Sequence, residues 1–374
     1  MSGNNYSFMV EQKFVNISDR TKLEKLLKKD YRCNKKLVVE KLTNAYILPY
    51  NKETNGGVVG EDKTYYKHSH LHRGGGTSYS FDNNDVTRIN EDVVYLGMFF
   101  NLWGHCITDE LKLLWFLLDT DYQFLKNCKL VYIPMQDFKF SENFSYILNK
   151  LGLDTSKLIP ITTITQFSHV YLPDDCFVCD DSTNLRYYTD EYLNLINFIT
   201  NDIYADTTYS KIYFTRTGLK NKKDTGEKYI ENVFREMGYK VISPEKLSFE
   251  QQVSLLKGCN YFATTEGSCA HNALFMNEGS NIIIIRKASY INEYQLCIDF
   301  AKKLDVTYID SYYSTLAPKN YEYFGPFFLY QSKFLSEYFG LKYKGFPFFY
   351  YLFSYRLYFF LRKIYGRIRR LLKI

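Results

Sequence analysis

The sequence predicts an α/β protein of two layered domains followed by a helical carboxyl-terminal tail. Its 374 residues exceed what one hydrophobic core usually organises. Strand-like and helix-like runs alternate along the chain, most regularly in its second half. The run NIIIIRK at 281–287 is almost continuously apolar, which is typical of a strand that is covered on both faces of a parallel sheet. We therefore expect the second domain to be Rossmann-like.

The pattern of the first half is weak up to about residue 90 and clearer beyond it. The expected elements are, in chain order, a Lys-rich helix at 22–29, a strand at 42–48, a Gly-rich loop at 74–76, the run VVYLGMFF from 93, a helix at 101–118, a strand at 129–133, a helix at 144–151 and strands around 159 and 170. This alternation predicts an α/β layer domain.

The second half repeats the alternation with better-marked ends. The expected elements are a strand at 211–215, a helix at 228–237 ended by Gly238, a strand from 240, a helix with Ser248 as N-cap and Gln251 at capping-box spacing, a strand at 261–265, a helix at 269–277 closed by Gly279 and a strand at 281–287. The apolar pattern lapses at 202–209, where we place the domain boundary.

Composition and charge narrow the class of protein. Hydrophobic residues make up 46% and charged residues 24% of the chain, which excludes a disordered chain and a multi-spanning membrane protein. The net charge of +6 comes from the carboxyl-terminal segment 346–374, which has seven basic residues and no acidic residue. The basic residues are Arg356, Arg362, Lys363, Arg367, Arg369, Arg370 and Lys373. The rest of the chain is nearly neutral, so we expect contact with an anionic surface rather than with nucleic acid.

The same tail has the spacing of an amphipathic helix. Apolar residues recur at intervals of four and three, with basic residues on the other faces: Leu357, Leu361, Ile364, Ile368 and Leu371. This pattern predicts that residues 346–374 lie in the interface of an anionic membrane. The alternative is packing of terminal helices across the domains, which we expect for residues 325–345.

Other features point to the cytoplasm. The amino-terminal segment MSGNNYSFMVEQKF has neither a basic start nor the apolar core of a signal peptide, and no apolar run approaches the roughly 20 residues of a membrane span. The eight cysteines are scattered without a regular framework, which favours thiols in a reducing compartment. We expect a cytoplasmic protein that is peripheral at the inner face of the cell membrane.

Two segments of the second domain are candidates for phosphate binding. The sequence Thr264, Thr265, Glu266, Gly267, Ser268 runs from a strand into a helix, where Gly267 permits a tight turn and Ser268 can cap. Arg216 follows the strand at 211–215, and its guanidinium could hold a diphosphate. The alternatives are an ordinary turn and a surface arginine.

His105 and Asp109 are the candidates for acid–base chemistry. They are four residues apart and so share one face of a helix. We expect Asp109 to be the general base, with His105 orienting it or itself serving as the base. The alternative is that Asp109 caps or pairs structurally and that His105 is a buried histidine with its hydrogen bonds satisfied.

Three further motifs resemble metal or redox sites, and we expect no metal at any of them. They are the Asp119, Thr120, Asp121 tripeptide, the alternating His68, His70 and His72, and the Cys176, Cys179 pair. Each lacks the surrounding residues that such a site needs.

Together the motifs resemble glycosyltransferase family 61. In the second half the matching residues are Tyr213 and Arg216, Asn232, Ser248, Gln252 and Val253, and the turn with Gly267, Ser268, Asn272 and Phe275. In the first half the stretch 101–109, NLWGHCITD, with Leu111, Leu114 and Trp115, is similar to the family's Gly-His-Phe-x-x-Asp motif and its sequel. The sequence departs from the family's usual residues at Cys106, Leu113, Gln251 and Glu266.

The resemblance implies a GT-B-like enzyme of two Rossmann-type domains facing a cleft. Its expected parts are an acceptor-side domain at 1–205, a nucleotide-sugar-binding domain at 206–320 and terminal helices with the basic aromatic tail at 321–374. The implied reaction is an inverting, metal-independent transfer of a sugar from a nucleotide-sugar, expected to be a UDP-sugar, to a capsule-type polysaccharide or lipid-linked glycan. No further cofactor is expected.

The resemblance also implies the site residues. The catalytic residues would be Asp109 and His105. The donor-binding residues would be Arg216, Gln252, Thr265, Glu266, Gly267, Ser268, Cys269, His271 and Asn272. A carboxylate at Glu266 would repel phosphate, so it would face sugar hydroxyls or the donor would differ from common ones. Two other hypotheses stay open: a non-catalytic nucleotide-sugar-binding or scaffold protein of a glycan assembly complex, and a different nucleotide-dependent α/β enzyme.

Overall fold

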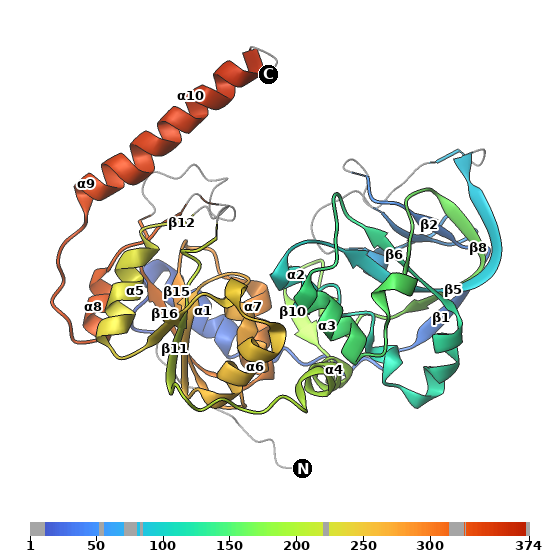
Figure 1. Ribbon diagram of the computed structural model, residues 1–374, viewed down its shortest axis with the longest axis horizontal. Helices are drawn as coiled ribbons and strands as arrows, with labels where there is room; N and C mark the ends of the chain where they lie inside the picture. The colour runs from blue at the N-terminus through green and yellow to red at the C-terminus, as the bar shows by residue number, and fades with distance from the viewer. Residues whose placement is uncertain are drawn as a thin grey trace. The chain divides into compact units, whose positions relative to one another are not determined.

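The computed structural model describes residues 12–51, 56–70, 81–82, 85–219, 224–313, 325 and 327–371. The chain forms two compact units (Figure 1). The amino-terminal unit comprises residues 30–203 with 248–250, and the carboxyl-terminal unit comprises 1–29, 204–247 and 251–374. The break at 203 and 204 lies close to the expected boundary. Residues 12–29 and the terminal helices, however, belong to the carboxyl-terminal unit rather than to the expected domains at 1–205 and 321–374.

The carboxyl-terminal unit has a five-stranded sheet in which all strands are parallel. Its order is β13-β11-β14-β15-β16. The first strand along the chain, β11, therefore lies between the second, β13, which is at the edge, and the third, β14. The strands are β11 (Lys211–Phe214), β13 (Lys240–Ile242), β14 (Tyr261–Thr265), β15 (Asn281–Arg286) and β16 (Asp305–Asp310). Four of them occupy the predicted positions, and β16 adds an edge strand that the sequence analysis did not predict.

Helices cover both faces of this sheet. On one face α5 (Glu227–Glu236) and α8 (Lys333–Tyr338) pack on apolar strand residues such as Tyr213 and Ile283. On the other, α7 (Glu293–Ala301) is tied to β16 by the Tyr308 hydroxyl, which donates to Asp299 at 2.6 Å. Two further helices are α1 (Ile17–Leu27) and α6 (Phe249–Gly258). The predicted helix at 269–277 is shorter than expected, a six-residue 3-10 helix η7 (Ala270–Phe275).

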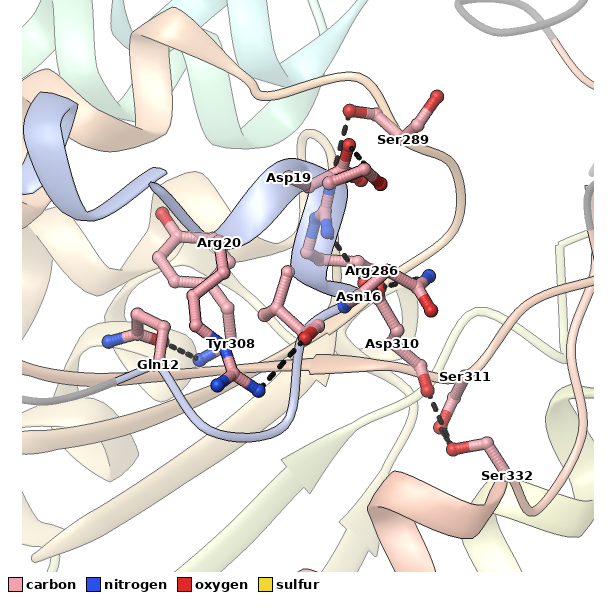
Figure 2. Close-up of polar contacts among 12 residues, drawn as sticks. Gln12, Asn16, Asp19, Arg20, Arg286, Ser289, Tyr308, Asp310, Ser311 and Ser332 are labelled. Carbon is pink, nitrogen blue, oxygen red and sulfur yellow. Dashed lines mark hydrogen bonds and ion pairs between the residues drawn. The ribbon is translucent and has the colours of Figure 1, made fainter. Parts of the chain in front are cut away.

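A polar network explains why the amino-terminal segment joins this unit (Figure 2). The Arg286 guanidinium pairs with Asp310 at 2.6 Å and with Asp19 at 3.0 Å. The backbone and side-chain N–H groups of Asn16 donate to the other Asp310 oxygen. Gln12 adds two hydrogen bonds to the backbone of β16, at Val306 and Tyr308. These contacts come from polar residues far apart in the sequence, so no hydrophobic period could reveal them.

The amino-terminal unit has a mixed sheet of order β4-β3-β2-β8-β5-β6-β7, with β1 paired to β8. Its parallel strands are β5 (Thr87–Phe99), β6 (Lys129–Pro134), β7 (Ile159–Pro160) and β8 (Thr165–Pro173). Its antiparallel strands are β1 (Val39–Thr43), β2 (Tyr46–Leu48), β3 (Gly57–Val59) and β4 (Tyr65–Tyr66). β2, β3 and β4 are joined by short connections without crossover helices, and β1 and β2 run antiparallel to β8. These four strands distinguish the sheet from the Rossmann type that was expected. A separate ribbon pairs β9 (Phe177–Cys179) with β10 (Arg186–Tyr188).

The predicted helix at 101–118 is wrong over most of its length. Only α2 (Trp103–Ile107) and the 3-10 turn η3 (Trp115–Leu117) are helical. Every side chain from Leu111 to Leu117 is buried, so the apolar residues here do not mark one face of a helix. The predicted helix at 144–151 is confirmed by α3 (Glu142–Lys150), and α4 (Asp190–Thr200) lies further on. Asp119, from one of the three motifs that resemble metal or redox sites, caps the 3-10 helix η4 (Thr120–Asn127) by accepting from the N–H of Asp121. His72 and the Gly-rich loop at 74–76 lie outside the described residues.

The carboxyl-terminal tail begins with α9 (Phe348–Tyr350) and the π-helix η9 (Tyr351–Leu357) and ends with α10 (Tyr358–Leu371). Tyr351 and Tyr355 are buried against Phe328 of β17 (Phe327–Phe328). The described apolar side chains of α10 are exposed, with Phe360 at 61% and Leu361 at 55%. In the part of the chain that is described, no helix is both long and apolar enough to span a membrane.

Candidate functional site

The carboxyl ends of β11 and β14 form the best-placed edge for a ligand. In a parallel sheet of this order the switch point lies between the first and third strands along the chain, here β11 and β14. Arg216 follows β11, and Gly267 follows β14 with φ of +113°. A methyl group placed on Gly267 would lie 3.8 Å from Arg216 Nη1. The structure therefore brings together two residues that the sequence analysis selected separately.

Two residues that the sequence analysis missed complete this edge. Lys287 follows β15, and its Nζ would lie 3.5 Å from the same methyl group on Gly267. The buried carboxylate of Asp224, at the start of β12 (Asp224–Thr225), pairs through Oδ2 with Arg216 at 3.3 Å and Lys287 at 3.5 Å. Burial lowers the pKa of Lys287, while the neighbouring carboxylate of Asp224 raises it. The position of Lys287 directly beyond an apolar parallel strand was the signal that could have revealed it.

The donor-binding residues expected from the resemblance divide into an accessible and a buried set. Arg216, Gly267 and Ser268 are partly exposed at the strand ends. The buried set is Gln252, Thr265, Glu266, Cys269, His271 and Asn272. The Gln252 side-chain amide donates to the Leu247 carbonyl oxygen, which is a structural contact. Burial raises the pKa of the Cys269 thiol to about 11, so it is neutral at physiological pH.

The source of positive charge at this turn differs from the expected one. We expected a helix N-terminus beginning near Cys269, but η7 has only six residues and is a 3-10 helix. Such a short helix has little macrodipole. Arg216 and Lys287, both next to Gly267, supply the positive charge instead.

Glu266 is a buried carboxyl group, 5% exposed, directly after β14. One of its oxygens has no hydrogen-bond partner among the described residues. Burial raises the pKa of Glu266 to about 7, although the positive charges of Arg286 and Lys287 oppose this shift. A substantial fraction of the group is therefore protonated near neutral pH, which reduces the repulsion that a fixed carboxylate would exert on phosphate.

Carboxylates in the first turns of α5 hold the backbone that carries Arg216. The Arg216 N–H donates to Glu227 Oε1 at 3.0 Å, and the Tyr213 hydroxyl donates to the same oxygen at 3.2 Å. The Thr215 hydroxyl donates to Glu231 Oε1 at 2.5 Å. These bonds fix the backbone of the segment after β11. Buried carboxylates therefore set the position from which the Arg216 side chain extends.

In the amino-terminal unit, His105 and Asp109 form a close pair just after β5. His105 Nδ1 lies 2.5 Å from Asp109 Oδ2, as their spacing predicted, although Asp109 lies beyond the end of α2. The Thr108 hydroxyl also contacts Asp109 Oδ2, at 3.2 Å. The side chain of Asp109 is 1% exposed and that of His105 is 14% exposed. The histidine is thus the member of the pair that an external hydroxyl can reach more easily.

Buried charged groups surround this pair. Burial raises the pKa of Glu110 well above its usual value, and one of its oxygens accepts from the Phe100 N–H at 2.8 Å. Burial lowers the pKa of Lys112, whose Nζ donates to the His70 carbonyl oxygen at 2.9 Å. Leu113, where the family often has Arg, is fully buried in the core of this unit. Among the described residues, no group of three or more His, Cys, Asp or Glu is arranged to hold a metal ion.

Comparison with known proteins gives one finding that bears on function. No curated protein sequence matches the chain. The model of the family described as Glycosyltransferase 61 matches residues 103–283, a little under half of the chain. The matched stretch includes His105, Asp109, Arg216 and Gly267, and it ends before Lys287. This part of the chain is therefore similar to glycosyltransferase 61, and the similarity supports a glycosyltransferase.

Proposed function

We propose that this protein is a glycosyltransferase that takes its sugar from a nucleotide-sugar and transfers it with inversion. The observation that carries the proposal is the convergence of Arg216 and Lys287 on Gly267, at the switch point of a parallel sheet. Two cations beside a glycine turn suit the diphosphate of a nucleotide-sugar. The family match over 103–283 supports the same reaction class.

In this proposal His105 is the general base and Asp109 is its positioning partner. The acceptor hydroxyl gives its proton to the imidazole as its oxygen attacks the anomeric carbon. The bond from that carbon to the diphosphate breaks, and its electron pair leaves on the nucleoside diphosphate. Asp109, held at 2.5 Å from Nδ1, orients the ring and stabilises its protonated form. This order of roles differs from the expectation that Asp109 itself is the base, because Asp109 is the more buried of the two.

Arg216 and Lys287 would stabilise the negative charge that develops on the departing diphosphate, so the proposal needs no metal ion for that task. We propose a UDP-sugar as donor and a cell-surface polysaccharide or lipid-linked glycan as acceptor. The GT-B-like arrangement of the two units stays a prediction.

The tail supports the proposal that the acceptor is presented at a membrane. Apolar side chains of Phe353, Phe360 and Leu361 are more than half exposed, and Lys363 and Arg367 are exposed beside them. Such a combination suits the interface of an anionic leaflet. We therefore propose that the protein is peripheral at the inner face of the cell membrane.

Incubation with a panel of nucleotide-sugars tests the function. Release of nucleoside diphosphate together with a new glycoside supports the transferase. Saturable binding without turnover supports the non-catalytic scaffold, which the buried Leu113 and Glu266 at departures from the family pattern favour as second candidate. Neither binding nor turnover would favour a different nucleotide-dependent enzyme.

A further inference from the structure

We infer that Lys287 and Arg216 together clamp the diphosphate of the donor, and that Asp224 is a built-in counterion that the diphosphate displaces. The inference deepens the proposed function and rests on it. Lys287 lies outside the stretch that matches the family model, so its role follows from geometry alone.

The first argument is that both cations meet on one oxygen. Arg216 Nη1 lies 3.3 Å and Lys287 Nζ lies 3.5 Å from the same oxygen of Asp224, Oδ2. Both nitrogens also lie close to Gly267, whose φ of +113° is a conformation that residues with a side chain rarely adopt. An oxygen that bridges two cations beside bare backbone is the arrangement that a phosphate oxygen needs. In the structure an oxygen of the Asp224 carboxylate takes that position.

The second argument concerns how the clamp is held. The ammonium group of Lys287 lies over the Phe327 ring, 4.9 Å from its centroid. Phe327 and Asp224 are paired in register in the two-stranded β12–β17 ladder, so one ladder positions both the ring and the carboxylate. Gly226 lies two positions after Asp224 and has a φ of +86°, and any side chain there would collide with the Leu329 carbonyl oxygen. The clamp therefore has a preformed frame, and binding requires no large rearrangement of backbone.

The third argument is the balance of charge. The Lys287 side chain is only 9% exposed and that of Asp224 is 2% exposed, so these charges are poorly screened by water. Two cations share one carboxylate here, although Glu227 and Glu266 lie close by. A diphosphate offers two phosphate groups, one for each cation, and binds better than a single carboxylate oxygen. Asp224 keeps the site compensated until the ligand arrives.

Calorimetry with inorganic pyrophosphate tests the clamp in the full chain. We expect Lys287→Met and Arg216→Gln each to weaken pyrophosphate binding by about tenfold or more. Asp224→Asn should strengthen it, because the competing charge is removed. Lys303→Met is the matched control. Lys303 pairs with Glu278 and precedes β16, so it lies at the amino ends of the strands, whereas Lys287 follows a carboxyl end. A titration with UDP distinguishes a nucleoside diphosphate from free pyrophosphate as the preferred ligand.

Unchanged affinity in Lys287→Met, or no pyrophosphate binding by the wild-type protein, would overturn the clamp. Weaker binding in Asp224→Asn would overturn the counterion role. If Lys287→Met does not fold, acetylation of the wild-type protein by acetic anhydride decides instead. Pyrophosphate should lower the labelling of Lys287 and leave that of Lys303 unchanged. Equal labelling of Lys287 with and without pyrophosphate refutes the inference. The proposed function fails separately. Pyrophosphate binding without turnover on any nucleotide-sugar keeps the clamp, and full turnover by Lys287→Met keeps the transferase.

Discussion

His105 Nδ1 lies 2.5 Å from Oδ2 of Asp109, and the histidine is the more exposed of the two side chains. A buried carboxylate that orients a more accessible imidazole is an arrangement that makes the imidazole a proton acceptor. The pair was expected from spacing, but burial reverses which member would meet the acceptor hydroxyl.

Asp109→Asn should abolish most transfer while leaving donor affinity nearly intact. The amide keeps the shape of the carboxylate but stabilises the protonated imidazole poorly, so kcat should fall by roughly 10²–10⁴-fold. Steady-state kinetics and UDP calorimetry on the same preparations would check this. His105→Gln should lower kcat similarly, because the acceptor hydroxyl then loses its proton acceptor. Full turnover by either variant would exclude that residue from the reaction.

Arg216→Ala should weaken UDP binding by about tenfold or more, because a charge-assisted contact with phosphate is lost. Calorimetry measures the effect directly. Lys211→Ala is the matched control, since Lys211 is an exposed cation at the other end of the same strand, β11. Equal affinities for the two variants would place the donor elsewhere.

Glu266→Gln should change how stability depends on pH. The pKa of Glu266 is raised from 4.5 to about 7, so between these values the native state binds more protons than the unfolded state. Stability therefore falls as pH rises through this window, and it stays lowered above it. The neutral amide removes that loss and should raise the free energy of unfolding at pH 8 by about 1–3 kcal/mol. Urea unfolding at pH 5 and pH 8 checks this, with exposed Glu236→Gln as control. Parallel profiles for the wild type and Glu266→Gln would contradict it.

Removal of the tail should abolish membrane binding without unfolding the protein. A chain truncated after Leu357 keeps Tyr351 and Tyr355 on Phe328 but lacks α10. It should fail to pellet with vesicles that contain phosphatidylserine, because each basic residue near an anionic leaflet contributes about 1 kcal/mol. Thermal unfolding should stay close to that of the full chain. Pelleting by a chain truncated after Lys344 would refute the membrane role of the whole tail.

Arg286→Met should destabilise the carboxyl-terminal unit strongly. The change leaves Asp310, whose side chain is 3% exposed, without its 2.6 Å ion pair. An uncompensated buried carboxylate of this kind costs about 3–5 kcal/mol. Urea unfolding measures the loss, and Arg286→Met combined with Asp310→Asn should recover part of it. A single variant as stable as the wild type would show that the network in Figure 2 is not needed for folding.

The sequence predicted those elements of the fold that short stretches of chain determine, namely buried strands, helix ends and contacts within one turn. The buried strands around Tyr213, Ala263 and Ile283 are runs of apolar residues. Helix α5 ends at Glu236, two residues before Gly238, the glycine that was expected to end it. The contact between His105 and Asp109 was predicted from their four-residue spacing, and it forms even though α2 ends before Asp109. These features depend on neighbours in the chain.

Features that depend on distant residues were not predictable in this way. The stretch from Leu111 to Leu117 is apolar and buried throughout, so it carries no period that distinguishes helix from turn. Lys287 and Asp224 are 63 positions apart in sequence and meet because β12 begins beside the carboxyl end of β15. The expected helix N-terminus at Cys269 failed because the segment tightens into η7, whose side chains are all buried.

The bonding of Gln12, Asn16 and Asp19 to β15 and β16 has a consequence for biosynthesis. Residues 12–29 leave the ribosome early, yet the strands they bind lie about 270 to 300 positions later. Residues 30–203, which make up most of the amino-terminal unit, are synthesised before those strands exist. Helix α1 can therefore reach its native contacts only after β15 and β16 have been synthesised, so the carboxyl-terminal unit closes around a segment made much earlier.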